Sequence, residues 1–331
     1  MISDSPDIQF LLQAVTTGMR LSSRLEASGD WDTLVKHDAS PVTVADFAVQ
    51  AVTAALLAKH NDGDVLVAEE SSAALRLPEN AHTLAAILSV VKQVLPEVDA
   101  EKLCAWIDRG ASEPGERFWV MDPIDGTKGF VRGGQYVVAL ARVENGDVVM
   151  SALGCPHLNQ QLQPDRDIGG SLLVAARGEG SWIRPSSGKE WRRLHVSTQS
   201  DARKARITHS FEPSHLNQDL LDALLDTLGT NVETLPMDSQ AKYAMLSGGA
   251  SDLLYRLTST GRPPGAECIW DHAAGALIVE EAGGCVTDLH GEPLDFTQGK
   301  RLAANTGVLV SNGLLHQAAL DAYRRVTGEA G

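Results

Sequence analysis

The feature that most restricts the fold is a run of apolar residues that ends in two aspartates. Residues 118–121, Phe-Trp-Val-Met, predict a buried strand, and Asp122 and Asp125 follow it three positions apart. The proline and glycine of this segment favour a sharp turn. Because hard divalent cations prefer oxygen ligands, the turn predicts either a Mg²⁺ site that also uses the Ile124 carbonyl, or a solvated turn in which Asp122 caps a helix.

Two further segments place carboxylates at the ends of predicted elements. Glu69 and Glu70 end the predicted strand 64–68. Adjacent like charges at that point repel each other unless a cation or solvent relieves them. Asp271 opens an apolar helix predicted at 270–282, either as its N-cap or as a carboxylate that projects into a metal cluster.

Asp46 and Thr127 are polar residues at the predicted starts of two other helices. Asp46 follows Thr43 by three positions in a capping-box pattern, with Asp in place of Glu or Gln. Together with Gln50 it falls opposite the apolar stripe of the helix predicted at 44–56, so it is free to face a site. Thr127 offers a hydroxyl where a helix begins, and free N–H groups at such a position favour a phosphate.

The order of the elements predicts two halves of different character. Residues 1–200 predict helices and a largely antiparallel sheet with hairpin turns at 144–147 and 177–180. Residues 201–331 alternate strands and helices, an α/β pattern that ends in two more strand-helix units. No flexible linker separates the halves, so we expect two domains, 1–200 and 201–331, that share a large interface.

Residues 71–117 are the least organised part of the sequence. One helical pattern, at 84–95, stands there within polar sequence. We therefore expect this segment to be an insertion or a lid.

Composition excludes several classes of protein. Lys and Arg number 28 against 43 Asp and Glu, a formal charge of −15 that argues against binding to nucleic-acid polymers. The four cysteines show neither a C-x-x-C pair nor a dense disulfide pattern, which indicates reduced thiols. No signal peptide and no apolar stretch of the ~20 residues that a membrane helix requires is present. We expect a cytoplasmic protein without a membrane partner, as a monomer or homodimer.

Four motifs together resemble the inositol monophosphatase superfamily of Mg²⁺-dependent, lithium-sensitive phosphatases. They occur in the order of that superfamily and span most of the chain. The motifs are Ser40-Pro41-Val42-Thr43-Val44-Ala45-Asp46, Ala68-Glu69-Glu70-Ser71-Ser72, Asp122-Pro123-Ile124-Asp125-Gly126-Thr127-Lys128-Gly129-Phe130 and Trp270-Asp271-His272-Ala273-Ala274-Gly275. The resemblance implies a layered α-β-α-β-α sandwich of the inositol monophosphatase and fructose-1,6-bisphosphatase type, and two or three Mg²⁺ ions.

Two signatures are similar to one branch of this superfamily, the 3′(2′),5′-bisphosphate nucleotidases. They are Gly-Thr-Lys-Gly-Phe at 126–130 and Asp238-Ser239-Gln240-Ala241-Lys242-Tyr243. The sequence departs from the usual His-Ser-x-His pattern of that branch, so either His209 or His215 takes the role of a nucleotide contact. Residues 261–265 also depart from the usual sequence of that branch, and we expect them to alter the adenine pocket.

The resemblance implies a role for each matching residue. Asp46 and Thr127 position and deprotonate the attacking water. We expect Glu70 to help orient the metal ligands or the water without being a metal ligand itself. The implied metal ligands are Glu69, Asp122, the Ile124 carbonyl, Asp125 and Asp271. The implied substrate contacts are Gly126, Thr127, Lys128, His209, Ser239, Lys242, Arg256 and Asp271.

The implied activity is hydrolysis of the 3′-phosphate of adenosine 3′,5′-bisphosphate to AMP and phosphate by a metal-activated water that attacks in line. The 5′-phosphosulfate analogue is a further substrate. One alternative is a phosphatase that acts on inositol phosphates or fructose 1,6-bisphosphate. Another is a regulator that binds metal or nucleotide without catalysis.

Overall fold

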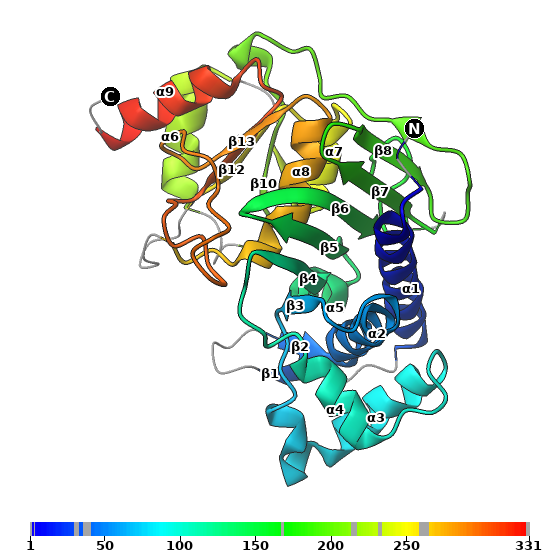
Figure 1. Cartoon of the computed structure of the whole chain (residues 1–331). Helices are drawn as coiled ribbons and strands as arrows, with labels where there is room; N and C mark the ends of the chain where they lie inside the picture. Colours follow the sequence, from blue (N-terminus) through cyan, green and yellow to red (C-terminus); the bar gives the residue numbers. More distant parts are fainter. Residues whose placement is uncertain are drawn as a thin grey trace.

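The computed structural model describes most of the chain (Figure 1). The described residues are 2, 4–29, 33–35, 41–166, 169–212, 217–230, 234–257 and 265–328. The predictions for Ser40, His215 and residues 261–264 lie outside the described residues. None of the described helices has the length and apolar character that crossing a bilayer requires.

The described elements stack in five layers, in the order helix, sheet, helix, sheet, helix (Figure 1). The helices of the three helical layers are, in that order, α1 (Pro6–Ser28) and α2 (Val44–His60), then α7 (Ala241–Ser247) and α8 (Ala273–Glu281), then α6 (Gln218–Leu228) and α9 (His316–Thr327). Three clusters of buried apolar side chains fill the spaces between these layers. This is the layered α-β-α-β-α arrangement that the resemblance implied.

Within the described residues, the larger sheet has seven strands and the smaller sheet has five. In spatial order the larger sheet contains β3 (Val65–Ala68), β4 (Arg117–Asp125), β5 (Val137–Glu144), β6 (Asp147–Cys155), β7 (Ser171–Ala176), β8 (Gly180–Pro185) and β9 (Arg192–Arg193). The smaller sheet contains β11 (Leu235–Met237), β10 (Ile207–Ser210), β12 (Leu253–Arg256), β14 (Val308–Ser311) and β13 (Cys285–Thr287). A separate pair joins β1 (Thr33–Val35) to β2 (Pro41–Thr43).

The larger sheet is antiparallel except where β3 pairs with β4, which confirms the prediction for the first half. Both predicted hairpins are present, between β5 and β6 and between β7 and β8. Asn145 and Gly146 join β5 to β6 with φ of 51° and 88°. Both values are positive, as the hairpin turn that favours Asn-Gly requires.

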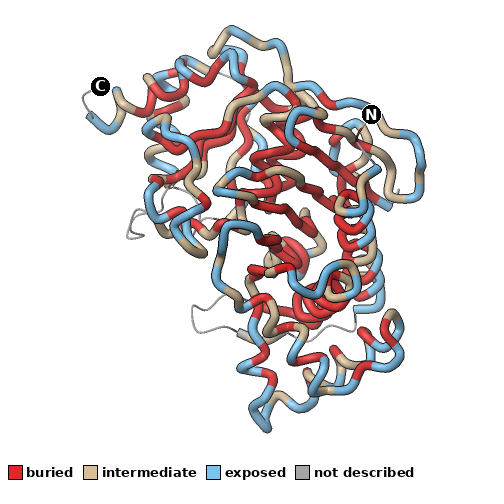
Figure 2. The backbone as a smooth tube through the Cα atoms, in the orientation of Figure 1, coloured by how far each residue is buried: buried red, intermediate tan, exposed pale blue. Residues whose placement is uncertain are grey.

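The first two helices, α1 and α2, cover one face of the larger sheet (Figure 1). α1 begins at Ser5, whose hydroxyl accepts a hydrogen bond from the Ile8 N–H, and it ends at Gly29 with φ of 68°. α2 is buried on nearly all sides, and Figure 2 shows it and the strands of the larger sheet as mostly buried. A Cβ on Gly18 of α1 would lie 2.9 Å from Val49 Cγ1 of α2, so a larger residue there would separate the two helices.

Residues 71–117 are more ordered than the sequence predicts. The predicted helix is α3 (Ala81–Lys92), and a second helix, α4 (Ala100–Asp108), follows it. Both pack against α2. The short pattern of buried Leu103 and Ile107 within polar sequence gave too little periodicity to predict α4.

The prediction of two closing strand-helix units is wrong. In the described residues 282–328, β13 is followed by irregular chain and by β14, and α9 is the one helix. The chain after β13 folds back so that β14 pairs antiparallel with both β13 and β12. This pairing puts α9 on the outer face of the smaller sheet.

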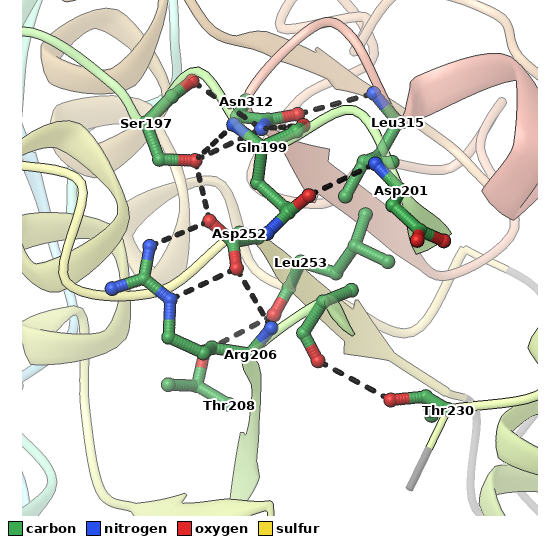
Figure 3. A network of polar contacts seen from close by, with 11 residues as sticks. Ser197, Gln199, Asp201, Arg206, Thr208, Thr230, Asp252, Leu253, Asn312 and Leu315 are labelled. Carbon is green, nitrogen blue, oxygen red and sulfur yellow. Dashed lines mark hydrogen bonds and ion pairs between the residues drawn. The ribbon is translucent and has the colours of Figure 1, made fainter. Parts of the chain in front are cut away.

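A polar network ties the segment between the two sheets to the smaller sheet (Figure 3). Arg206 Nε and Nη2 donate to the two oxygens of Asp252 at 3.0 and 2.7 Å, and Ser197 Oγ donates to Asp252 Oδ1. Asn312 Nδ2 donates to Ser197 Oγ at 3.0 Å. Because Asp252 is fully buried, these donors offset the cost of placing its charge away from water.

Candidate active site

The pairing of β3 with β4 explains why Glu69 and Asp122 meet. The two strands are parallel, and Ala68 is the register partner of Met121. The next residues are Glu69, which follows the end of β3, and Asp122, which is still within β4, and they therefore lie side by side. Asp122 lies in β4 and is 2% exposed, so the alternative of a solvated turn with a helix cap is wrong.

β4 continues through the motif and ends at Asp125. Its pairing with β5 shifts register between Asp122 and Asp125, where Pro123 has no N–H to donate to the ladder. Asp122 Oδ1 accepts a hydrogen bond of 3.1 Å from the Ile124 N–H. The irregularity keeps both aspartates near one another at the strand end.

Asp271 joins these two aspartates from the other half of the chain. Carboxylate oxygens of Asp122, Asp125 and Asp271 all lie within 4.8 Å of one another. Asp271 ends a short 3₁₀ turn, η5 (Ile269–Asp271), and the N-cap of α8 is His272. The N-cap alternative for Asp271 is therefore wrong, and its carboxylate is part of an acidic cluster.

The acidic cluster carries unfavourable electrostatic energy by itself. Burial raises the pKa of Asp122 well above its ordinary value, and the charges of Glu69 and three aspartates raise it further. Burial and the charge of Asp125 likewise raise the pKa of Asp271. Several buried hard oxygen donors that repel each other fit a divalent cation such as Mg²⁺, whose charge removes the repulsion.

Asp125 is anchored by Gln240, a residue that the sequence analysis did not assign to the site. The Gln240 N–H donates to Asp125 Oδ2 at 2.5 Å. The Gln240 side chain donates to the Trp270 carbonyl at 3.0 Å and accepts from the Gly275 N–H at 2.8 Å. One residue thus holds Asp125 and both sides of Asp271 in fixed relative positions.

Asp46 and Thr127, for which the resemblance implies a shared role at the attacking water, lie within hydrogen-bond distance of each other. Thr127 begins α5 (Thr127–Arg132), after Gly126 with φ of 88°. Its Oγ1 lies 3.1 Å from Asp46 Oδ1 and 3.1 Å from the Ile124 carbonyl. Because a hydroxyl has one proton, it donates to one of these oxygens at a time.

The other oxygen of Asp46 serves the start of α2. Asp46 Oδ2 accepts from Thr43 N at 2.8 Å and from Thr43 Oγ1 at 2.6 Å, so the predicted capping box is present. These two bonds fix the carboxylate and leave Oδ1 directed at Thr127. The polar side of α2 therefore faces the acidic cluster, as predicted.

Glu70 is buried beside this side of α2, and its backbone is held by Gln50. Gln50 Oε1 accepts from the Glu70 N–H at 2.9 Å, and Gln50 Nε2 donates to the Glu70 and Ile107 carbonyls at 2.7 Å each. Gln50 thereby fixes the chain after β3 and connects it to α4. The sequence showed Gln50 on the polar side of the helix but gave no sign of these partners.

The second half of the chain supplies a buried cation, Lys242, and a partly buried one, Arg256. Lys242 Nζ donates to the Met237 carbonyl at 3.1 Å and to the Ser239 carbonyl at 2.8 Å. Burial lowers the pKa of Lys242 to about 8, although the charge of Asp125 opposes that shift. Arg256, on β12, donates through Nε to Glu267 Oε2 at 3.0 Å. The charges of Glu267 and Asp271 contribute to a raised pKa of Arg256, against the effect of burial.

Ser239 lies against the phosphate-binding turn that the motif predicts. A Cβ on Gly126 would come within 3.0 Å of Ser239 Cβ. Ser239 itself has a positive φ of 62°, an uncommon conformation for a residue other than glycine. The predicted contacts Gly126, Ser239 and Lys242 therefore gather beside Asp125.

Lys128 and His209 bond with protein groups. Lys128 Nζ lies 3.2 Å from Glu212 Oε2. His209 Nδ1 lies 2.9 Å from the Ser210 carbonyl, and its Nε2 lies 3.2 Å from Thr234 Oγ1. None of the described contacts of His209 joins it to the acidic cluster.

Comparisons with known proteins identify the family of this chain. The inositol monophosphatase family matches residues 7–326. A 3′(2′),5′-bisphosphate nucleotidase of Schizosaccharomyces pombe is 35% identical over 311 residues, which cover 89% of this chain and 87% of the relative. A protein of the same name from Dictyostelium discoideum is 38% identical over 301 residues, with 89% of each chain covered.

Solved structures share the fold at lower sequence identity. The IMPase of Thermotoga maritima gives a TM-score of 0.67 at 21% identity, and the match covers 99% of this chain and 100% of that one. The extragenic suppressor protein suhB of Bartonella henselae gives 0.67 at 19% identity, with 97% and 99% covered. The family match and the sequence relatives together confirm the resemblance, and the chain belongs to the inositol monophosphatase family.

Proposed function

We propose that this protein is a Mg²⁺-dependent phosphomonoesterase that removes the 3′-phosphate of adenosine 3′,5′-bisphosphate and releases AMP and phosphate. The observation that carries the proposal is the acidic cluster of Asp122, Asp125 and Asp271 next to two cations, the buried Lys242 and the partly buried Arg256. The carboxylates of the cluster are ligands for metal ions that bind a scissile phosphate, and the two cations can bind a second phosphate of the same substrate. The names of the S. pombe and D. discoideum relatives support this choice of substrate.

In this proposal, the metal ligands come from both halves of the chain, 1–200 and 201–331, which we treat as two domains. They are Glu69, Asp122, the Ile124 carbonyl, Asp125 and Asp271, for two or three ions. Bound Mg²⁺ supplies positive charge that relieves the repulsion between the phosphate dianion and its nucleophile, and lowers the pKa of a water. Gln240 and Gln50 keep the carboxylate-bearing segments in place.

The attacking water is positioned by Thr127 and Asp46. The Thr127 hydroxyl has two acceptors within 3.1 Å, so its oxygen is fixed and can accept a proton from a water. Asp46 Oδ1 is the acceptor for the proton that the water loses, directly or through the threonine hydroxyl. Since Asp46 Oδ2 is already held by Thr43, the base does not rotate away during the reaction.

The nucleotide is held from the second half of the chain. Lys242 and Arg256 bind the 5′-phosphate, and Ser239 with the turn at Gly126 binds near the scissile phosphate. Lys128 and His209 reach the nucleotide after exchange of their present partners, Glu212 and Thr234. We further propose a cytoplasmic monomer or homodimer; the four free cysteines support the cytoplasmic location.

A panel of substrates tests this proposal. Phosphate release is measured with Mg²⁺ for adenosine 3′,5′-bisphosphate, its 5′-phosphosulfate analogue, inositol 1-phosphate and fructose 1,6-bisphosphate. The expected result is the highest kcat/KM for the two adenosine nucleotides. A preference for inositol 1-phosphate or fructose 1,6-bisphosphate would replace the proposed substrate, and tight nucleotide binding with no hydrolysis at any Mg²⁺ concentration would indicate a regulator.

A further inference from the structure

A chain of hydrogen bonds connects Arg256 to Tyr243 through Glu267 and His272. Tyr243 Oη lies 2.6 Å from His272 Nδ1, and His272 Nε2 lies 3.2 Å from Glu267 Oε2. The same carboxylate oxygen accepts from Arg256 Nε at 3.0 Å. The four residues come from α7, β12 and the segment that leads into α8.

The Glu267 end of the chain has a defined direction of donation. An ionised carboxylate can only accept hydrogen bonds, so His272 Nε2 is the donor in its contact with Glu267 Oε2. Burial raises the pKa of Tyr243, so its hydroxyl keeps its proton, and it lies within hydrogen-bond distance of His272 Nδ1. Glu267 Oε2 thus receives two hydrogen bonds, one from His272 and one from Arg256.

Glu267 is a buried anion, and its side chain is 6% exposed. Burial alone would raise its pKa, but the charge of Arg256 and the hydrogen bond from His272 lower it below the ordinary value. Oxygen and nitrogen atoms of Glu267, Asp271 and His272 also lie within 4.8 Å of one another, as in a metal site. Here the guanidinium of Arg256 already forms an ion pair with the carboxylate at 3.0 Å, so a metal ion is not needed to balance its charge.

The contact with Glu267 leaves part of the Arg256 guanidinium for a ligand. The described hydrogen bonds of this guanidinium involve Nε, so Nη1 and Nη2 remain. These are the two donors that form a bidentate pair with a phosphate. The Arg256 side chain is 16% exposed, which gives the substrate access to it.

We propose that Glu267 is a positioning residue that orients Arg256 toward the second phosphate of the substrate, with His272 and Tyr243 holding the carboxylate in turn. This inference rests on the proposed function and adds a determinant of its specificity. Glu267 does not touch the substrate. It acts on a phosphate that is not the one hydrolysed, so it governs binding of bisphosphates and not the chemical step.

The test compares a bisphosphate with a monophosphate. Glu267→Gln keeps the size of the side chain and removes its charge. We expect the KM for adenosine 3′,5′-bisphosphate to rise about tenfold, the usual order for a lost charge-assisted hydrogen bond, while kcat changes less than about twofold. Hydrolysis of adenosine 3′-monophosphate, which has no second phosphate, should keep its kcat/KM within about twofold. Equal losses with both substrates would overturn the proposal.

A double-mutant cycle tests whether Glu267 acts through Arg256. In an Arg256→Ala background, Glu267→Gln should change the KM for the bisphosphate by less than about twofold, because the group that it positions is gone. Multiplicative losses in the double variant would overturn the proposal. Glu267→Asp keeps the charge and should give a KM between those of the wild type and Glu267→Gln. If Glu267→Gln does not fold, Glu267→Asp replaces it in the comparison of the bisphosphate with the monophosphate.

Two controls separate this inference from the proposed function. Glu280→Gln alters a partly exposed carboxylate of α8 that pairs with Arg177, and both substrates should behave as with the wild type. If the wild type hydrolyses neither adenosine nucleotide, the proposed function fails. If the wild type is active and Glu267→Gln affects both substrates alike, the proposed role of Glu267 fails and the proposed function stands.

Discussion

Asp125 and Gln240 form a hydrogen bond of 2.5 Å that joins the end of β4 to the start of α7. The same glutamine bonds the backbone on both sides of Asp271, at Trp270 and at Gly275. Two carboxylates from distant parts of the sequence therefore depend on one residue for their separation. This arrangement suggests that metal affinity is sensitive to a residue that binds no metal.

Gln240→Ala should weaken metal binding. The backbone bond to Asp125 remains, but the Trp270 carbonyl and the Gly275 N–H lose their partners, so Asp271 is less well placed. We expect the Mg²⁺ concentration for half-maximal activity to rise about 10- to 100-fold, as for other residues that orient metal ligands. Gln317→Ala, which alters an exposed residue of α9, is the control and should have no effect. An unchanged Mg²⁺ dependence in Gln240→Ala would contradict this role.

Thr127→Ala should slow the chemical step. Loss of the hydroxyl removes the group between Asp46 and the Ile124 carbonyl, so the water is neither oriented nor deprotonated efficiently. We expect kcat to fall by about 10²- to 10⁴-fold with little change in KM. Thr127→Ser retains the hydroxyl and should keep most of the activity. Steady-state kinetics on the three proteins decides the matter, and a Thr127→Ala enzyme with normal kcat would exclude this role.

Lys242 should give the reaction a dependence on alkaline pH. Burial lowers its pKa to about 8, so the side chain is charged below that pH and neutral above it. The 5′-phosphate requires the charged form, and kcat/KM for the bisphosphate should therefore fall as the pH rises through about 8. Lys242→Met should have a low kcat/KM without this fall. Lys92→Met, an exposed lysine of α3, serves as control; persistence of the same fall in Lys242→Met would assign it to another group.

Asp252→Asn should destabilise the fold in a pH-dependent manner. Burial raises the pKa of Asp252, but its bonds with Arg206 and Ser197 outweigh burial and lower it overall. A lowered folded-state pKa gives stability that is present above about pH 4 and lost as the pH falls through the folded-state value. We expect Asp252→Asn to cost about 3 kcal/mol at pH 7 and less in acid.

Urea unfolding of both proteins at several pH values measures this effect. Asp226→Asn, an exposed aspartate of α6, is the matched control and should stay within about 0.5 kcal/mol of the wild type. A difference between Asp252→Asn and wild type that does not shrink in acid would contradict the assigned cause.

Much of the site could be predicted because its residues end elements with clear patterns. The apolar runs before Glu69 and Asp122 predict β3 and β4, and their parallel pairing then brings the two carboxylates together. The family resemblance gave Asp46 and Thr127 a common role, but the hydrogen bond between them was not predicted. No local pattern reports a contact between the starts of two helices so far apart in the sequence.

Residues that act by holding other parts of the protein in place escaped prediction. Gln50, Gln240 and Glu267 bond to segments whose positions are set by tertiary packing, so neither their type nor their spacing reveals the partner. The helix α4 was missed for a similar reason, because its stability comes from packing against α2 and not from a long amphipathic pattern.

The most direct measurement of the central claim is phosphate release from adenosine 3′,5′-bisphosphate with Mg²⁺ by the wild type and by Asp122→Asn, with the nucleotide product identified. The wild type should yield phosphate and adenosine 5′-monophosphate. Asp122→Asn should be inactive yet folded, since it removes a buried charge that four other carboxylates repel. Near-normal phosphate release by Asp122→Asn, or adenosine 3′-monophosphate as the wild-type product, would contradict the account.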